Sequence, residues 1–157
     1  MGSLNEQFGS SGQSITCTIN SLTNTSARQS TAIDNSTTLY SDALVNVTIV
    51  SSASSTSSTG YVAIYAVGTV DGGSTYGEGA GSSDAAITLT VPTNAKLIGI
   101  LNVVANSTTY HSNPFSVAAA FGGVLPQKWV IIVQNESGAT LASSGNSAQY
   151  QGVYGEY

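Results

Sequence analysis

Apolar and polar side chains alternate in short runs along this chain, and Gly, Asn, Asp and Ser residues separate the runs. In the range 43–50, Val45, Val47 and Ile49 occupy every second position, with Asn or Thr between them. A period of two is typical of strands that bury one face. The range 61–69 is apolar at most positions, which favours a strand with both faces buried.

The same pattern recurs along the rest of the chain. It predicts strands at 14–20, 43–50, 61–69, 86–91, 96–105, 115–120, 128–135, 140–142 and 148–154. Many short strands at regular spacing are typical of a sandwich or barrel. We therefore expect an all-β, jelly-roll-like β-sandwich of about eight antiparallel strands. Helix signals are weak; the best one, 116–121, is short and ends at two glycines, so we expect a strand or a single turn there.

A chain of 157 residues fits one domain. Residues 1–12 are polar and rich in Gly and Ser, which predicts a mobile N-terminal arm before a single domain at 13–157. The low-complexity range 51–59 predicts a flexible hairpin loop. The Gly-rich range 71–84 predicts a second long loop, and loops of this length tend to be functional or contact surfaces.

Charged residues are scarce, at 7% of the chain against roughly a quarter in ordinary soluble domains. There are three Lys and Arg residues and eight Asp and Glu residues, with a net charge of −5. This balance argues against nucleic-acid binding and against anionic membrane surfaces. No apolar stretch reaches the roughly 18–20 residues that span a bilayer. The first residues lack the pattern of a signal peptide, so we expect synthesis in a cytoplasm.

Residues for catalysis are few and scattered. His111 is the only histidine, which excludes multi-histidine zinc sites, and no Gly-x-Ser-x-Gly motif accompanies it. A pair of carboxylates can hydrolyse glycosides, but the candidates lie at predicted strand ends and in loops, where Asp serves turns and caps. These candidates are Asp34, Asp42, Asp71, Glu78, Asp84 and Glu136. We expect no enzyme activity, no catalytic residue and no cofactor.

Two further groups have competing interpretations. Asp71, Glu78 and Asp84 share one Gly-rich loop, which suits either a calcium site or an ordinary acidic loop, and their spacing fits no EF-hand. We assign no metal ligand. Cys17 is the only cysteine, so an intrachain disulfide is impossible. With no basic residue near it in sequence to activate the thiol, we expect a small core residue.

The eight tyrosines can pack on strands, line subunit interfaces or stack on sugars. Tyr110, Tyr150, Tyr154 and Tyr157 are the candidates for these roles. A glycan- or receptor-binding module is one alternative function, with Tyr76, Tyr110 and the loop 71–84 at its surface.

The scarcity of charged residues also bears on whether the protein assembles with other copies or other proteins. Flat, hydroxyl-rich strand edges promote association, and the cores of protein interfaces are depleted of charge. We therefore expect a symmetric homo-oligomer or a subunit of a larger particle.

Several segments resemble small virion structural proteins of tailed bacteriophages. The most specific is Pro-Phe-Ser-Val-Ala-Ala-Ala-Phe-Gly-Gly at 114–123, and the resemblance covers roughly 14–154. The other segments are 42–45, 65–76, 97–100, 124–126 and 150–154. The resemblance implies a virion component without catalysis, made in the host cytoplasm, and it assigns no functional residues.

Within that resemblance, small size and the N-terminal arm favour a capsid decoration (cement) protein, with a trimer favoured, that binds the major capsid protein. A tail, collar or fibre component that binds tail proteins is the alternative, beside the receptor- or glycan-binding module. Neither nucleic acid nor membrane is an expected partner.

Overall fold

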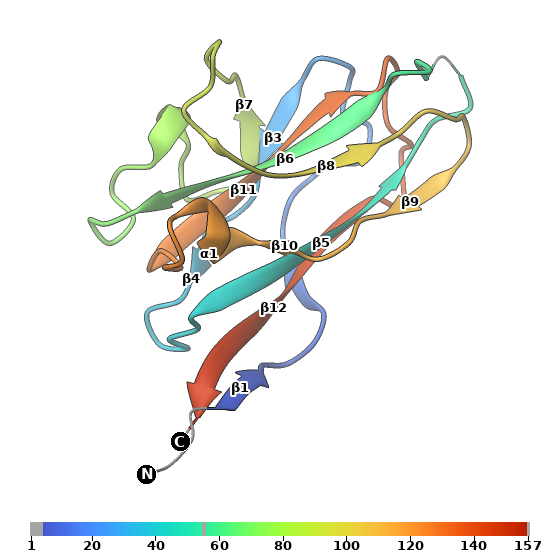
Figure 1. Ribbon diagram of the computed structural model, residues 1–157. Helices are drawn as coiled ribbons and strands as arrows, with labels where there is room; N and C mark the ends of the chain where they lie inside the picture. Colours follow the sequence, from blue (N-terminus) through green and yellow to red (C-terminus); the bar gives the residue numbers. More distant parts are fainter. Residues whose placement is uncertain (1–4, 55, 157) are drawn as a thin grey trace.

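The computed structural model describes residues 5–54 and 56–156, and these form two antiparallel β-sheets packed face to face (Figure 1). Sheet 1 contains β1 (Asn5–Phe8), β2 (Gln13–Ile15), β5 (Asp42–Val50), β9 (Thr109–His111), β10 (Phe115–Ser116) and β12 (Ser147–Glu156). Sheet 2 contains β3 (Ala27–Gln29), β4 (Ile33–Asp34), β6 (Tyr61–Thr69), β7 (Ala85–Ile87), β8 (Lys96–Asn102) and β11 (Lys128–Glu136). The helical segments are α1 (Val117–Ala120) and the 3₁₀ turn η1 (Gly77–Gly79).

The strand order is that of a jelly roll. β1 and β2 both pair with β12, β9 and β10 both pair with β5, and β3 and β4 both pair with β11, so each couple acts as one interrupted strand. Numbering the resulting eight strands along the chain gives the order 1-8-3-6 in sheet 1 and 2-7-4-5 in sheet 2, with β7 as an extra edge strand. This order is the two-sheet arrangement of jelly rolls. The prediction of an all-β, jelly-roll-like sandwich is confirmed.

Alternating side chains of the two sheets meet in the main core. Val45, Val47 and Ile49 of β5 are buried there, as the alternation predicts. From sheet 2, Trp129 lies fully buried and meets the ring of Tyr150 edge-on, with 5.6 Å between ring centroids. Burying each of the large aliphatic side chains contributes about 1.5–3 kcal/mol, so this interdigitated layer is what holds the sheets together.

A second, smaller core lies on the outer face of sheet 2. The long connection between β6 and β8 folds back over this face and buries Tyr76, Ala80 and Ala95 against Val130 and Ile132. β6 is therefore covered on both faces for part of its length, which is the origin of its continuous apolar sequence.

Some predicted strands are shorter than expected. The strand predicted at 14–20 covers only Gln13–Ile15, because the chain then crosses to sheet 2, where the Thr16 carbonyl accepts the N–H of Thr31 at 2.8 Å. The one predicted at 86–91 ends at Ile87, and the one at 96–105 ends at Asn102.

Other segments differ from the expectation in kind. The range 115–120 combines both predicted alternatives: two strand residues followed by α1, whose first turn is capped by the Ser116 hydroxyl. The range 140–142 holds only an isolated bridge between Leu141 and Ser51. β3, β4 and β9 were not predicted.

The prediction of a hairpin loop at 51–59 is wrong. A hairpin would join two paired strands, but β5 belongs to sheet 1 and β6 to sheet 2, so this loop crosses between the sheets. The hydroxyl-rich sequence signals a loop without indicating which strands pair beside it.

Part of the segment expected to be an N-terminal arm is paired. Residues Asn5–Phe8 form β1 opposite Val153–Glu156, and the two strands project together beyond the sandwich (Figure 1). Most of the β1 side chains are exposed, so backbone pairing is the main contact that holds this strand. Met1–Leu4 lie outside the described residues, and mobility of the arm stays a prediction.

The loops gather at two opposite ends of the sandwich. The amide end, at the upper right of Figure 1, comprises the loops 16–26, 51–60, 103–108 and 137–146. The apolar end, at the left and bottom of Figure 1, comprises the loops 35–41, 70–76 and 117–127 together with β1 and the end of β12.

Candidate functional site

Each of the six candidate carboxylates accepts hydrogen bonds from its own set of neighbours. Asp42 accepts from the Ser116 hydroxyl at 2.6 Å and from the Ala118 N–H at 2.8 Å, and so ties β5 to α1. Asp34 accepts from the Ser36 N–H and forms an ion pair with Lys128. Glu136 accepts from the Gln134 amide at 2.8 Å. These are the turn and cap roles that the sequence predicts.

The three acidic residues of the 71–84 loop also have separate partners. Asp71 accepts from the N–H groups of Ser74 and Thr75 and closes its own turn. Asp84 pairs with Arg28 at 2.5 Å and also accepts from Thr18. Among residues 5–54 and 56–156, no group of three or more His, Cys, Asp or Glu side chains could hold a metal ion. The arrangement favours the ordinary acidic loop over the calcium site.

Glu78 fixes the segment that follows β7. Its carboxylate accepts from the Thr90 N–H at 2.8 Å, from the Thr90 hydroxyl at 2.9 Å and from the Asn94 N–H. The backbone N–H groups of Thr90 and Asn94 lower the pKa of Glu78 to about 2. We call residues 88–95 the strap.

His111 and Cys17 lack the surroundings of catalytic residues. His111 is exposed on β9, and its Nδ1 atom lies 3.1 Å from the Thr48 hydroxyl. Cys17 is half-buried against the main core. Burial and then the charge of Asp84 raise the pKa of the thiol to about 12, although Arg28, which the fold brings near, acts in the opposite direction. A thiol with so high a pKa is a poor nucleophile at neutral pH.

The tyrosines singled out in the sequence have structural contacts. Tyr110 accepts hydrogen bonds from the N–H groups of Val104 and Ala105 and so holds the loop 103–108. Tyr150 packs on Trp129 and donates to Gln13 at 3.0 Å, while Tyr154 lies beside Tyr40 with ring centroids 6.2 Å apart. Tyr157 lies outside the described residues.

Tyr76 does not lie at the surface, contrary to the expectation for a glycan-binding loop. It is buried in the outer core, and no hydrogen-bond partner of its hydroxyl is found in the described part of the chain.

Three loop tips at the apolar end carry exposed apolar side chains. Leu39 and Val124 are 73% and 70% exposed, and Val70 is fully exposed; Phe8 of β1, at the same end, is 58% exposed. Glycines with positive φ, such as Gly122 and Gly123, shape these turns. Exposed apolar surface concentrated in one region is typical of interaction sites, whereas single exposed apolar residues, such as Val91 and Val104 elsewhere on this protein, are ordinary.

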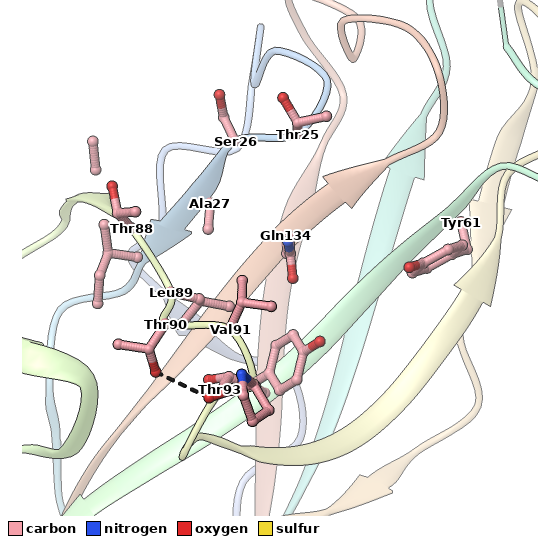
Figure 2. Close-up of a pocket in the computed structure, with 14 residues that line it drawn as sticks. Thr25, Ser26, Ala27, Tyr61, Thr88, Leu89, Thr90, Val91, Thr93 and Gln134 are labelled. Carbon is pink, nitrogen blue, oxygen red and sulfur yellow. Dashed lines mark hydrogen bonds between the residues drawn. The ribbon is translucent and has the colours of Figure 1, made fainter.

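A groove of about 640 Å³ lies on the outer face of sheet 2 (Figure 2). Its floor comes from β3, β6 and β11, and the strap forms one wall. Figure 2 shows the Gln134 side chain on the floor, between the strap and the ring of Tyr61. Volumes of 300–1,000 Å³ are usual for small-molecule sites.

The groove is lined by neutral side chains. None of its 14 residues is Asp, Glu, Lys, Arg or His. Leu89, Val91 and Pro92 contribute apolar surface, and Tyr61 and Tyr65 contribute rings and hydroxyl groups. In the described structure neither tyrosine hydroxyl makes a hydrogen bond. Burial, with Tyr61 and Glu136 nearby, raises the pKa of the Tyr65 hydroxyl, which therefore stays protonated at neutral pH.

Sequence reasoning did not find this groove. Tyr61 and Tyr65 are four positions apart on one strand, and this spacing places both side chains on the same face. That signal alone cannot distinguish an open face from a covered one. The groove exists because the strap leaves the sheet after Ile87, which the alternation at 86–91 did not indicate.

Comparison with known proteins gives no match: no family model, no curated protein and no solved structure matches this chain. The resemblance to bacteriophage structural proteins gains no support from these comparisons. In the described ranges, no helix has the length and apolar character needed to cross a membrane.

Proposed function

We propose that this chain is a non-catalytic structural protein of a bacteriophage particle, most simply a decoration protein that binds the head shell. The observation that carries the proposal is the gathering of exposed apolar side chains on loop tips at one end. The ionisable side chains, by contrast, are mostly engaged in local hydrogen bonds and ion pairs. Together these features favour a protein whose role is to bind another protein of the particle.

The apolar end supplies the contact surface in this proposal. Leu39, Val70 and Val124 project from three different loops, so they can insert into a neighbouring protein as separate anchors. Apolar anchors surrounded by uncharged polar groups are typical of the cores of protein interfaces. A homotrimer on the shell would bring three such ends to one symmetry junction.

The fold is compatible with this role and with others. Jelly rolls occur in viral capsid proteins and in lectins, and a fold does not by itself specify a function. The support from the fold is therefore an analogy, and the proposal depends on the apolar end and on the phage-like segments.

The first test is the number of copies per particle, from a quantified gel of purified virions, with the mass of the free protein from light scattering. A decoration protein is present in many copies, and particles lacking it lose heat resistance. A few copies per virion would place it in the tail instead. Absence from infectious particles, together with a monomeric mass at high concentration, would overturn the proposal.

A matched pair of variants tests the contact surface. Val70→Asp places a charge at the apolar end and should abolish binding to particles that lack the protein. Val91→Asp places the same charge on the strap, at a residue that is also almost fully exposed, and should leave binding unchanged. Equal effects of the two substitutions would show that the apolar end is not the contact surface.

A further inference from the structure

We infer that the groove on the outer face of sheet 2 is a binding site for a neutral saccharide. This site is separate from the apolar end, and the inference does not depend on the proposed role in a particle. The groove is held open, its lack of charged side chains disfavours ionic ligands, and its surface chemistry suits sugars.

The wall of the groove is fixed before any ligand binds. Glu78 accepts two hydrogen bonds from Thr90 and one from the Asn94 N–H, so the strap is held at both of these points. The Thr90 hydroxyl also lies 3.2 Å from the Pro92 carbonyl, as the dashed line in Figure 2 shows. A preformed groove spares a ligand the cost of ordering the loop.

The charges argue against an ionic ligand. No lysine or arginine lines the groove to attract a phosphate, a sulfate or an acidic sugar. The nearest acidic groups are engaged: Glu136 with the Gln134 amide, and Glu78 with the strap. A neutral ligand is the one class that this electrostatic environment does not penalise.

The surface chemistry favours a saccharide among neutral ligands. A sugar has an apolar face that stacks on aromatic rings and a rim of hydroxyl groups that need partners. The groove offers the rings of Tyr61 and Tyr65, whose backbone positions lie about 13 Å apart along the strand at about 3.3 Å per residue. It also offers the hydroxyls of Tyr61, Tyr65 and Thr88 and the free amide oxygen of Gln134.

A proline-rich peptide is the competing occupant, because such peptides dock in aromatic grooves. The hydroxyl-rich lining, which includes Thr25, Ser26, Thr88 and Thr93, favours the polyhydroxylated ligand. The floor strands β3, β6 and β11 each pair with neighbours on both sides, so the only strand edge that borders the groove in the described structure is that of the three-residue β7, which is short for pairing with a strand-like peptide.

The test is a titration of the ¹⁵N-labelled protein with maltohexaose, cellohexaose and chitohexaose, followed by NMR. We expect at least one of these probes to shift the strap amides and the Gln134 side-chain amide, with a dissociation constant on the order of 1 mM. Decaproline is titrated in parallel. No shift with any of the three saccharides, or shifts at the groove with decaproline alone, would overturn the inference.

Matched variants locate the binding. Tyr61→Ala removes one stacking ring from a partly exposed position and should weaken binding about threefold to tenfold. Gln134→Leu keeps the volume but removes the amide and should also weaken it. Tyr154→Ala removes a tyrosine outside the groove and should bind as the unchanged protein does. Equal affinity of Tyr61→Ala, Gln134→Leu and Tyr154→Ala would contradict the site.

The outcome is distinguishable from that of the proposed function. Tyr61→Ala should still bind particles, because the apolar end is intact, and Val70→Asp should still bind saccharide.

Discussion

In this chain with few charged residues, the two ends of the sandwich differ in the contacts that their loop side chains make. At the amide end, neutral side chains tie the loops 16–26 and 137–146 to each other and to the sheets: Asn135 donates to the carbonyls of Leu22 and Ala139, and Asn146 joins Asn20 to β5. At the apolar end, loop tips project into solvent with apolar side chains exposed. Hydrogen-bonded amides supply most of these contacts at the first end, where the Thr18 N–H also bonds the Asp84 carboxylate, whereas the tips of the second end are left exposed.

The largest expected effect is on the amide end. Asn135 is fully buried, and its side chain makes two donor bonds and accepts one from the Ser137 N–H at 3.0 Å. Asn135→Ala leaves these buried groups short of partners and should lower the free energy of unfolding by about 2–3 kcal/mol. For a chain of this length the melting temperature should fall by about 5–10 °C.

The matched control is Asn102→Ala, which removes the same amide from an exposed position on β8. Its effect should stay within about 0.5 kcal/mol. If chemical denaturation gives the two variants the same stability, the amide end is not what stabilises the loops.

The sequence predicted the strands that bury a regular face, and missed those whose burial depends on distant partners. β5, β6 and β11 were predicted to within one or two residues because apolar alternation marks β5 and continuous apolar runs mark β6 and β11. β3 was missed because it carries Arg28 and Gln29, which are polar in sequence. In the fold, Arg28 pairs with Asp84, and the Gln29 amide donates hydrogen bonds to the carbonyls of Gly81 and Ser83. All three partners lie more than 50 residues away along the chain.

A smaller effect is expected where the core meets the apolar end. Asp42 binds the Ser116 hydroxyl and the Ala118 N–H and so caps α1. Asp42→Ala should cost about 1–2 kcal/mol, as loss of a helix cap does. Glu156→Ala removes the same charge from the exposed end of β12 and should change stability little. A denaturation midpoint of Asp42→Ala equal to that of Glu156→Ala would show that the cap contributes nothing.

Acid should distinguish two segments held by carboxylates, the strap and residues 35–41, from the amide end. The folded pKa of Glu78 is about 2, below its ordinary value of 4.5, and that of Asp34 is about 2, below 3.8. A lowered carboxyl pKa contributes stability that is present above the ordinary value and is lost as the pH falls towards the folded value. Amides and hydroxyls at the amide end do not titrate in this window.

Hydrogen exchange between pH 4.5 and 2 checks this expectation. The amides of the strap and of residues 35–41 should lose protection relative to the loops 103–108 and 137–146, after correction for the intrinsic pH dependence. Glu78→Gln should reduce the pH dependence at the strap. Uniform loss of protection in the strap, in residues 35–41 and at the amide end would contradict this expectation.

The candidate site was less predictable than the fold. The sequence indicated that Asp71, Glu78 and Asp84 serve turns or a metal, and the structure places them in three separate hydrogen-bond sets. It could not indicate that Glu78 holds the strap, because that contact joins residues 12 and 16 positions apart through loop geometry. The exposed Leu39, Val70 and Val124 lay outside every predicted strand, and no alternation marks a loop tip.

The smallest expected effect on stability is at those tips, and it is the most informative. Leu39→Ser and Val124→Ser remove apolar surface that is already in water, so each should change the free energy of unfolding by less than about 0.5 kcal/mol. If the apolar end is a contact surface, the same variants should lower the mass seen by light scattering at high concentration or weaken particle binding. Val91→Ser is the control, since it removes an equally exposed valine outside that end. Unchanged stability with unchanged association in all three would leave the exposed tips without a role in assembly, and the contrast between the two ends would then be one of packing alone.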